Sequence, residues 1–268
     1  VGEPVLDPDG STLSMWAVFR DVSDLRRTQR AARETREIMR RSRHAAQTEH
    51  RLAVRLQEAV LPPWLGPLSF PRSGPQVLDL AARYLPCTAG AQLGGDWYDA
   101  LELPDGTTLL TVGDITGRGV PATSGMAMLL GALRGMALAG VGPGAMLRLL
   151  NQLLDRTAHP ALGTAVCCRF DPDRRTLTWA QAGHPAPVLY REGGARTLEP
   201  PEGVLLGVTE EACYEERTEQ LAPGDVVVLY TNGLVPHRDS ETAAGVRQMA
   251  GLAPRIAEAE SAHDCVRL

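Results

Sequence analysis

Lysine is absent from this chain of 268 residues, so all 27 of its cationic side chains are arginines. Its five cysteines include no Cys-x-x-Cys pair; they are Cys87, Cys167, Cys168, Cys213 and Cys265. An odd number of cysteines without that spacing argues against a disulfide framework or a zinc ribbon, and favours a reducing, cytoplasmic location. The opening residues do not show the pattern of a secretory leader. The most apolar stretch, residues 126–139, contains Arg134 and is too short to cross a bilayer.

Two families of catalytic site are excluded by what the chain lacks. Without lysine there is no P-loop, and no Gly-x-Ser-x-Gly nucleophile elbow occurs. Charge is unevenly divided: residues 25–60 hold ten Arg against four Glu, and the remainder holds seventeen Arg against 28 acidic residues. An acidic body argues against nucleic-acid binding there. The arginine-rich segment is most simply explained as a solvated helix face, and we expect neither RNA nor a membrane as its partner.

Two segments combine carboxylates with glycines where a strand is expected to end: Gly94-Gly95-Asp96-Trp97-Tyr98-Asp99 and Gly113-Asp114-Ile115-Thr116-Gly117-Arg118-Gly119. Residues 101–112 between them predict a β-hairpin that turns at Pro104-Asp105-Gly106. A hairpin returns its second strand beside its first, so Asp96 and Asp114 are predicted neighbours. Two carboxylates with a nearby backbone carbonyl would form an all-oxygen site suited to Mg or Mn. The alternative is that each segment is only a turn, because Gly and Asp favour turns for their own reasons.

The rest of the body alternates strands and helices. Helices are predicted at residues 121–139 and 143–156. Strands are predicted at residues 77–84, 164–170, 176–180, 188–190, 215–221 and 226–230. Strand runs with an inserted pair of helices predict an α+β layered domain built on antiparallel sheet. The adjacent Cys167 and Cys168 should point to opposite faces of their strand.

The first sixty residues have a different character. Residues 1–19 predict two short strands around Asp7-Pro8-Asp9-Gly10, and residues 25–60 contain no Pro or Gly, which predicts one long helix. Its apolar residues recur every seven positions in two adjacent columns, a weak coiled-coil seam, from which we expect a parallel homodimer. The columns are Leu25, Ala32, Met39, Ala46, Ala53 and Val60, and Ala31, Ile38, Ala45, Leu52 and Ala59. Leu61-Pro62-Pro63 ends the helix, and the stretch up to Pro75 reads as a connector.

Five motifs in order identify a resemblance. Besides the two carboxylate segments they are Leu56-Gln57-Glu58-Ala59-Val60-Leu61-Pro62, Ala182-Gly183-His184-Pro185-Ala186-Pro187 and Leu221-Ala222-Pro223-Gly224-Asp225-Val226-Val227-Val228-Leu229-Tyr230-Thr231-Asn232-Gly233-Leu234-Val235. Together they resemble bacterial metal-dependent serine/threonine phosphatases of the SpoIIE/RsbU kind, within the PPM family. A weaker resemblance relates Phe19-Arg20-Asp21-Val22-Ser23-Asp24 to the exit of a PAS sensor domain. These resemblances imply a sensor remnant at residues 1–24, a signalling helix at 25–61 and a phosphatase domain at 62–268.

The phosphatase resemblance implies a fold and a mechanism. The fold is a four-layer αββα sandwich of two antiparallel sheets flanked by helices. Two Mn or Mg ions activate a water for attack on phosphoserine or phosphothreonine, and the implied substrate is a phosphorylated anti-sigma-factor antagonist. By motif position Asp96 and Asp114 are the catalytic metal ligands, with Asp114 bridging and the Ile115 carbonyl assisting.

Two departures from the family pattern bear on activity. Asn232 stands where the family usually carries a metal-ligating Asp. An amide oxygen can ligate a cation but brings no charge, so the metal affinity should fall. Alternatively, Asn232-Gly233 is only a hairpin turn. The family's last metal Asp has no good equivalent, since Asp264 lies in a segment, residues 261–268, that reads as a helix before a final strand; we expect the domain to continue beyond Leu268. Arg118 also replaces a frequent His. His184, between Gly and Pro, is better explained as structural than as an acid–base catalyst. These departures leave open an alternative function, a degenerate domain that binds a phosphorylated partner without turnover.

Overall fold

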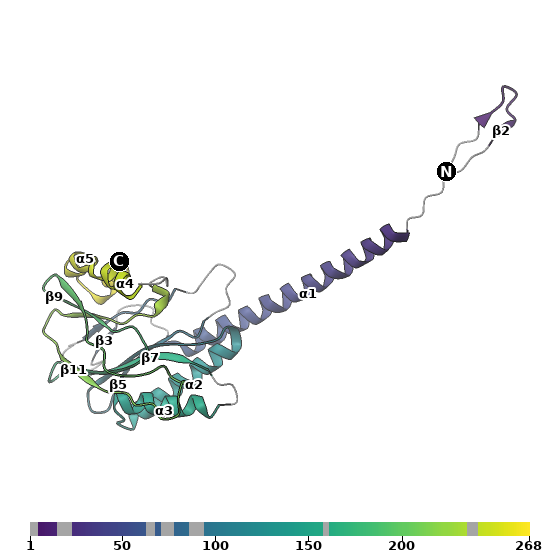
Figure 1. Cartoon of the computed structure of the whole chain (residues 1–268). Helices are drawn as coiled ribbons and strands as arrows, with labels where there is room; N and C mark the ends of the chain where they lie inside the picture. The colour runs from purple at the N-terminus through teal and green to yellow at the C-terminus, as the bar shows by residue number, and fades with distance from the viewer. Residues whose placement is uncertain are drawn as a thin grey trace. The chain divides into compact units, whose positions relative to one another are not determined.

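The computed structural model describes residues 5–14, 23–62, 68–70, 78–85, 94–157, 161–234 and 241–268 (Figure 1). The chain divides into two compact units, Val1–Thr48 and Glu49–Leu268. Most of the PAS-like exit, Cys87 and Val235 lie outside the described residues. The domain boundaries expected near residues 24 and 61, and the sensor-like character of the first segment, remain predictions.

In the first unit a short hairpin precedes the long helix. Strand β1 (Val5–Leu6) pairs with β2 (Thr12–Ser14) in antiparallel fashion. Helix α1 extends from Ser23 to Val60 without interruption, which confirms the predicted helix. The helix continues into the second unit, where Ala53 is fully buried.

A five-stranded antiparallel sheet forms the centre of the second unit, in the order β11-β8-β7-β6-β5. Its strands are β5 (Trp97–Glu102), β6 (Thr108–Ile115), β7 (Gly163–Asp171), β8 (Thr176–Ala182) and β11 (Arg217–Gln220). The turn between β5 and β6 closes where the Gly106 N–H donates to the Leu103 carbonyl. The hairpin predicted between the two carboxylate segments is therefore confirmed.

A second antiparallel sheet has three strands in the order β10-β9-β12. They are β9 (Val188–Arg191), β10 (Gly194–Thr197) and β12 (Val226–Val228). Strand β10 was not predicted from the sequence. The two residues that connect it to β9, Glu192 and Gly193, have φ angles of 50° and 74°. Two successive positive φ angles are the requirement of a tight two-residue hairpin turn, and the flanking strands are too short to show a clear alternation.

The sheets and helices stack in four layers, which confirms the expected αββα arrangement. Helices α2 (Gly119–Leu138) and α3 (Pro143–Asp155) cover one face of the five-stranded sheet, while α4 (Glu241–Ala250) and α5 (Ala253–Ala257) pack on the three-stranded sheet (Figure 1). Cys167 packs in the core beneath α2 and α3, and Cys168 packs in the core between the two sheets. The opposite orientation predicted for these two buried cysteines is thus correct, and it marks the two faces of β7.

Several predicted boundaries were wrong. The stretch that was interpreted only as a connector contains β3 (Leu68–Phe70), which pairs with β4 (Leu78–Leu80). Strand β4 is shorter than the predicted strand at residues 77–84, since residues 81–84 are not in a strand. Helix α6 (Ala262–Cys265) covers only the first part of the helix predicted at residues 261–268. Within the described residues, no helix is both long and apolar enough to cross a membrane.

Candidate functional site

The pairing of β5 with β6 brings the two carboxylate segments to one edge of the five-stranded sheet. Trp97 pairs with Gly113, and one further step of this register sets Asp96 opposite Asp114. The pairing continues past the end of β5, since the Ile115 N–H donates to the Gly95 carbonyl at 3.3 Å. The neighbouring position predicted for Asp96 and Asp114 is therefore confirmed, while their role as metal ligands stays a prediction.

The electrostatics of this pair are unfavourable without a cation. Burial, the negative charge of Asp96 and a hydrogen bond between the two carboxyl groups together raise the pKa of Asp114 to about 7. Two close carboxylates disfavour simultaneous ionisation unless a positive charge lies between them. The same arrangement is one that a hard divalent cation would stabilise.

The end of β6 approaches the residues before β5 so closely that position 95 has room only for glycine. A Cβ atom at this position would lie 2.4 Å from the Ile115 carbonyl oxygen and 2.2 Å from the Ile115 Cγ2 atom. The Ile115 side chain is only 3% exposed, so it cannot move aside. At the neighbouring Gly94 the nearest contact would be 3.9 Å, to Asp96 Oδ1. The glycine thus lets the Ile115 carbonyl lie against the backbone next to Asp96. Carboxylate and carbonyl oxygens are the donor types that suit Mg or Mn, and the role of this carbonyl as a metal ligand stays a prediction.

The segment after β12 reaches the same edge from the other sheet. The Thr231 hydroxyl donates to Asp96 Oδ2 at 3.0 Å, although 135 positions separate the two residues. Asn232 follows directly and opens a short 3₁₀ helix, η1 (Asn232–Leu234). The next described element is α4, so among the described residues Asn232-Gly233 does not join two paired strands. The sequence analysis identified Asn232 but missed Thr231. The one available signal was that Thr231 directly precedes a predicted ligand position.

His184 lies in the core of this region. It is 5% exposed, and its ring nitrogens lie 3.0 Å from Thr164 Oγ1 and 3.0 Å from the Tyr230 carbonyl. Burial lowers the pKa of His184 to about 4, and the bond to Tyr230 offsets only part of this effect. A neutral imidazole with both nitrogens occupied agrees with the structural interpretation of this residue.

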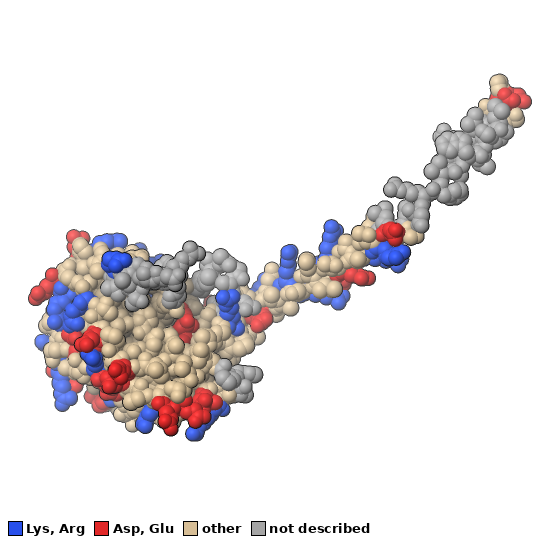
Figure 2. Space-filling view, in the orientation of Figure 1, with Lys and Arg blue, Asp and Glu red and all other residues tan. Residues whose placement is uncertain are grey.

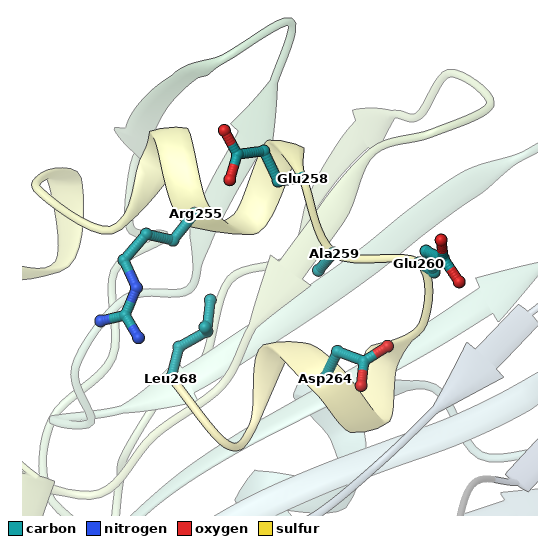
Figure 3. A pocket seen from close by; sticks show the side chains of 6 residues that line it. All are labelled: Arg255, Glu258, Ala259, Glu260, Asp264 and Leu268. Carbon is teal, nitrogen blue, oxygen red and sulfur yellow. The ribbon is translucent and has the colours of Figure 1, made fainter.

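A separate hollow lies away from this edge. A pocket of about 450 Å³ lies between α5 and α6 at the C-terminal end, and Figure 3 shows the side chains that line it. They are Arg255, Glu258, Ala259, Glu260, Asp264 and Leu268. Asp264 Oδ2 accepts a hydrogen bond from the hydroxyl of Ser261, the residue that caps α6, so this carboxylate is engaged within its own helix. The part of the chain that the structure describes contains no cluster of three or more His, Cys, Asp or Glu side chains arranged to hold a metal ion. A third carboxylate beside Asp96 and Asp114 is therefore not found among the described residues.

Comparisons with known proteins agree with this architecture. The family model "Stage II sporulation protein E (SpoIIE)" matches residues 104–268, a range that includes Asp114 and Asn232. The phosphoserine phosphatase RsbU of Bacillus subtilis is 25% identical over 166 residues, which are 61% of this chain and 48% of RsbU.

Solved structures give the same result. The RsbU and RsbW domains of Rv1364c from Mycobacterium tuberculosis are 32% identical, with a TM-score of 0.55 over 62% of this chain and 47% of that one. The SiaA-PP2C domain of Pseudomonas aeruginosa shares the fold, with 20% identity and a TM-score of 0.57 over 81% of this chain and 87% of that one. The chain spans about half the length of RsbU and of the mycobacterial protein. Because the family model covers more than half of the sequence, the chain belongs to the SpoIIE family.

Proposed function

We propose that this protein is a Mn- or Mg-dependent protein phosphatase that hydrolyses phosphoserine or phosphothreonine on a bacterial signalling protein. The observation that carries the proposal is the register of β5 and β6, which sets Asp96 opposite Asp114 beside the Ile115 carbonyl. Membership of the SpoIIE family and similarity to a phosphoserine phosphatase support it. By the same similarity, the proposed substrate is a phosphorylated anti-sigma-factor antagonist, and the proposed location is the cytoplasm.

In this proposal the chain's own residues would hold two divalent ions in a fixed arrangement. Asp96 and Asp114 would supply charged oxygens to the ions, and the Ile115 carbonyl and the Asn232 amide would supply neutral ones. Bound ions would lower the pKa of a water and neutralise charge on the transferring phosphoryl group. The rigid strand pairing at Gly95 and Gly113 keeps the carboxylates in place, so that little reorganisation is needed when the substrate binds.

Asn232 motivates the second candidate function, a domain that binds a phosphorylated partner without turnover. An amide ligand lacks the charge of a carboxylate, and the affinity of hard cations follows the number of charged ligands. The decisive comparison is phosphate release from a phosphoserine peptide by the full-length protein and its Asn232→Asp variant over a Mn titration. We expect activity in both, with the variant saturating at lower Mn concentration. Activity only in the variant would favour the partner-binding function, and activity in neither would exclude the phosphatase.

We also propose that α1 forms a parallel homodimer. Between residues 31 and 52 the apolar stripe that repeats every seven positions is exposed within the chain: Ile38 is 68% exposed, Met39 57% and Leu52 50%. Figure 2 shows charged side chains, mainly arginine, along the same helix, which would keep a monomer soluble. Ile38→Glu should shift sedimentation equilibrium toward monomer, because a charge in the seam cannot be buried. The control is His44→Glu, on the side of the helix away from the stripe, which should leave the association unchanged. A wild-type protein that stays monomeric at high concentration would contradict the dimer.

A further inference from the structure

The bond between Thr231 and Asp96 joins the two sheets at the site. Asp96 immediately precedes β5 in the five-stranded sheet, and Thr231 follows β12 in the three-stranded sheet. The hydroxyl donates to Asp96 Oδ2 at 3.0 Å. A carboxylate oxygen accepts and cannot donate when ionised, so the direction of this bond is settled by chemistry. Oδ2 of Asp96 is thereby occupied by a hydrogen bond, and the carboxylate is held in one orientation.

A second contact holds the backbone of the residue that precedes Thr231. The Tyr230 carbonyl can only accept, so His184 Nε2 carries the proton of that 3.0 Å bond, and Nδ1 accepts from the Thr164 hydroxyl. Thr164 is the register partner of Asp114 on β7. The His184 backbone N–H in turn donates to Gln181 Oε1 at 3.0 Å. The segment that carries Thr231 and Asn232 is therefore tied to the strand that pairs with Asp114 as well as to Asp96.

We propose that Thr231 is a positioning residue for the metal centre, whose hydroxyl orients Asp96 and sets residue 232 at the same edge. This inference rests on the proposed phosphatase function. Ligating carboxylates are commonly hydrogen-bonded through their remaining oxygen, and loss of such a partner costs about 10- to 100-fold in metal affinity or activity. His184 acts one step further away, by holding the Tyr230 carbonyl.

The test distinguishes the effect of the Thr231 hydroxyl as a hydrogen-bond donor from the effect of the volume of its side chain. Thr231→Val keeps a branched side chain of nearly the same size and removes the donor, whereas Thr231→Ser keeps the donor. Thr231→Ala serves if the valine variant does not fold, as judged by circular dichroism. The matched control is Thr178→Val, which removes a hydroxyl that contacts Thr218 between β8 and β11.

Titration calorimetry with Mn alone is the first measurement. We expect Thr231→Val to bind Mn about 10- to 100-fold more weakly, and Thr231→Ser and Thr178→Val to stay within about threefold of the wild type. In turnover of a phosphoserine peptide, kcat at a fixed Mn concentration should fall while KM for the peptide changes little. A merely structural role would lower stability without this change in Mn affinity.

Two results would overturn the inference in distinguishable ways. If the wild type binds Mn and Thr231→Val binds it equally well, or Thr231→Ser weakens binding as much as Thr231→Val, then Thr231 does not position the site and the phosphatase proposal is untouched. If the wild-type protein binds no Mn, the metal centre itself fails and the inference fails with it.

Discussion

Asp114→Asn is expected to reduce phosphate release by about a thousandfold or more. Metal ions supply several kcal/mol of transition-state stabilisation, and each 1.36 kcal/mol corresponds to a factor of about ten in rate. Asparagine retains the size of the side chain but removes the charge of a carboxylate that we propose as a metal ligand. Phosphate release from a phosphoserine peptide at saturating Mn measures the effect.

The same variant should not harm the fold in the absence of metal. Asp96 and Asp114 repel each other when both are ionised, and the neutral amide removes that repulsion, so the free energy of unfolding measured with a chelator at about pH 8 should stay the same or rise. Asp173→Asn makes the same chemical change in the exposed turn between β7 and β8, and it should retain full activity. An Asp114→Asn enzyme within about tenfold of the wild type would show that this carboxylate is not a catalytic ligand.

Gly113→Ala is expected to lower the free energy of unfolding by about 3 kcal/mol, at the upper end of the usual cost of overpacking a core. A Cβ atom there would lie 2.2 Å from the Trp97 ring and 2.6 Å from the Thr164 carbonyl oxygen. Trp97 is 1% exposed and the carbonyl belongs to the paired strand β7, so neither can give way without disturbing the sheet. Urea denaturation measures the change.

A second glycine provides a control, because its replacement should change the free energy of unfolding in the opposite direction. Gly131 lies in the middle of α2, and a Cβ atom there would meet nothing within 4 Å. Gly131→Ala should therefore raise the free energy of unfolding by about 0.5–1 kcal/mol, because alanine loses less backbone entropy in a helix. Equal effects of the two substitutions would contradict the packing at Gly113. The clash at Gly113 also predicts lower activity, since Gly113 immediately precedes Asp114.

Local signals in the sequence were sufficient for much of this fold. The absence of Pro and Gly between residues 25 and 60 predicted α1, and Asp105-Gly106 predicted the β5–β6 hairpin. That hairpin is a local pairing whose register follows from its turn, so the proximity of Asp96 and Asp114 follows from the order of residues along the chain. The alternation of side chains along a strand likewise placed Cys167 and Cys168 on opposite faces.

Tertiary structure decided the features that depend on distant partners. Strand β3 has no distinctive composition and exists because β4 pairs with it. The bond from Thr231 to Asp96 connects two sheets across 135 positions, and His184 meets the Tyr230 carbonyl only once those sheets have stacked. Such contacts have no local signature, because they arise from the packing of whole layers rather than from the preferences of neighbouring residues. By itself the sequence determined which carboxylates meet at the strand ends, whereas the layer packing decided which neutral side chains hold them there.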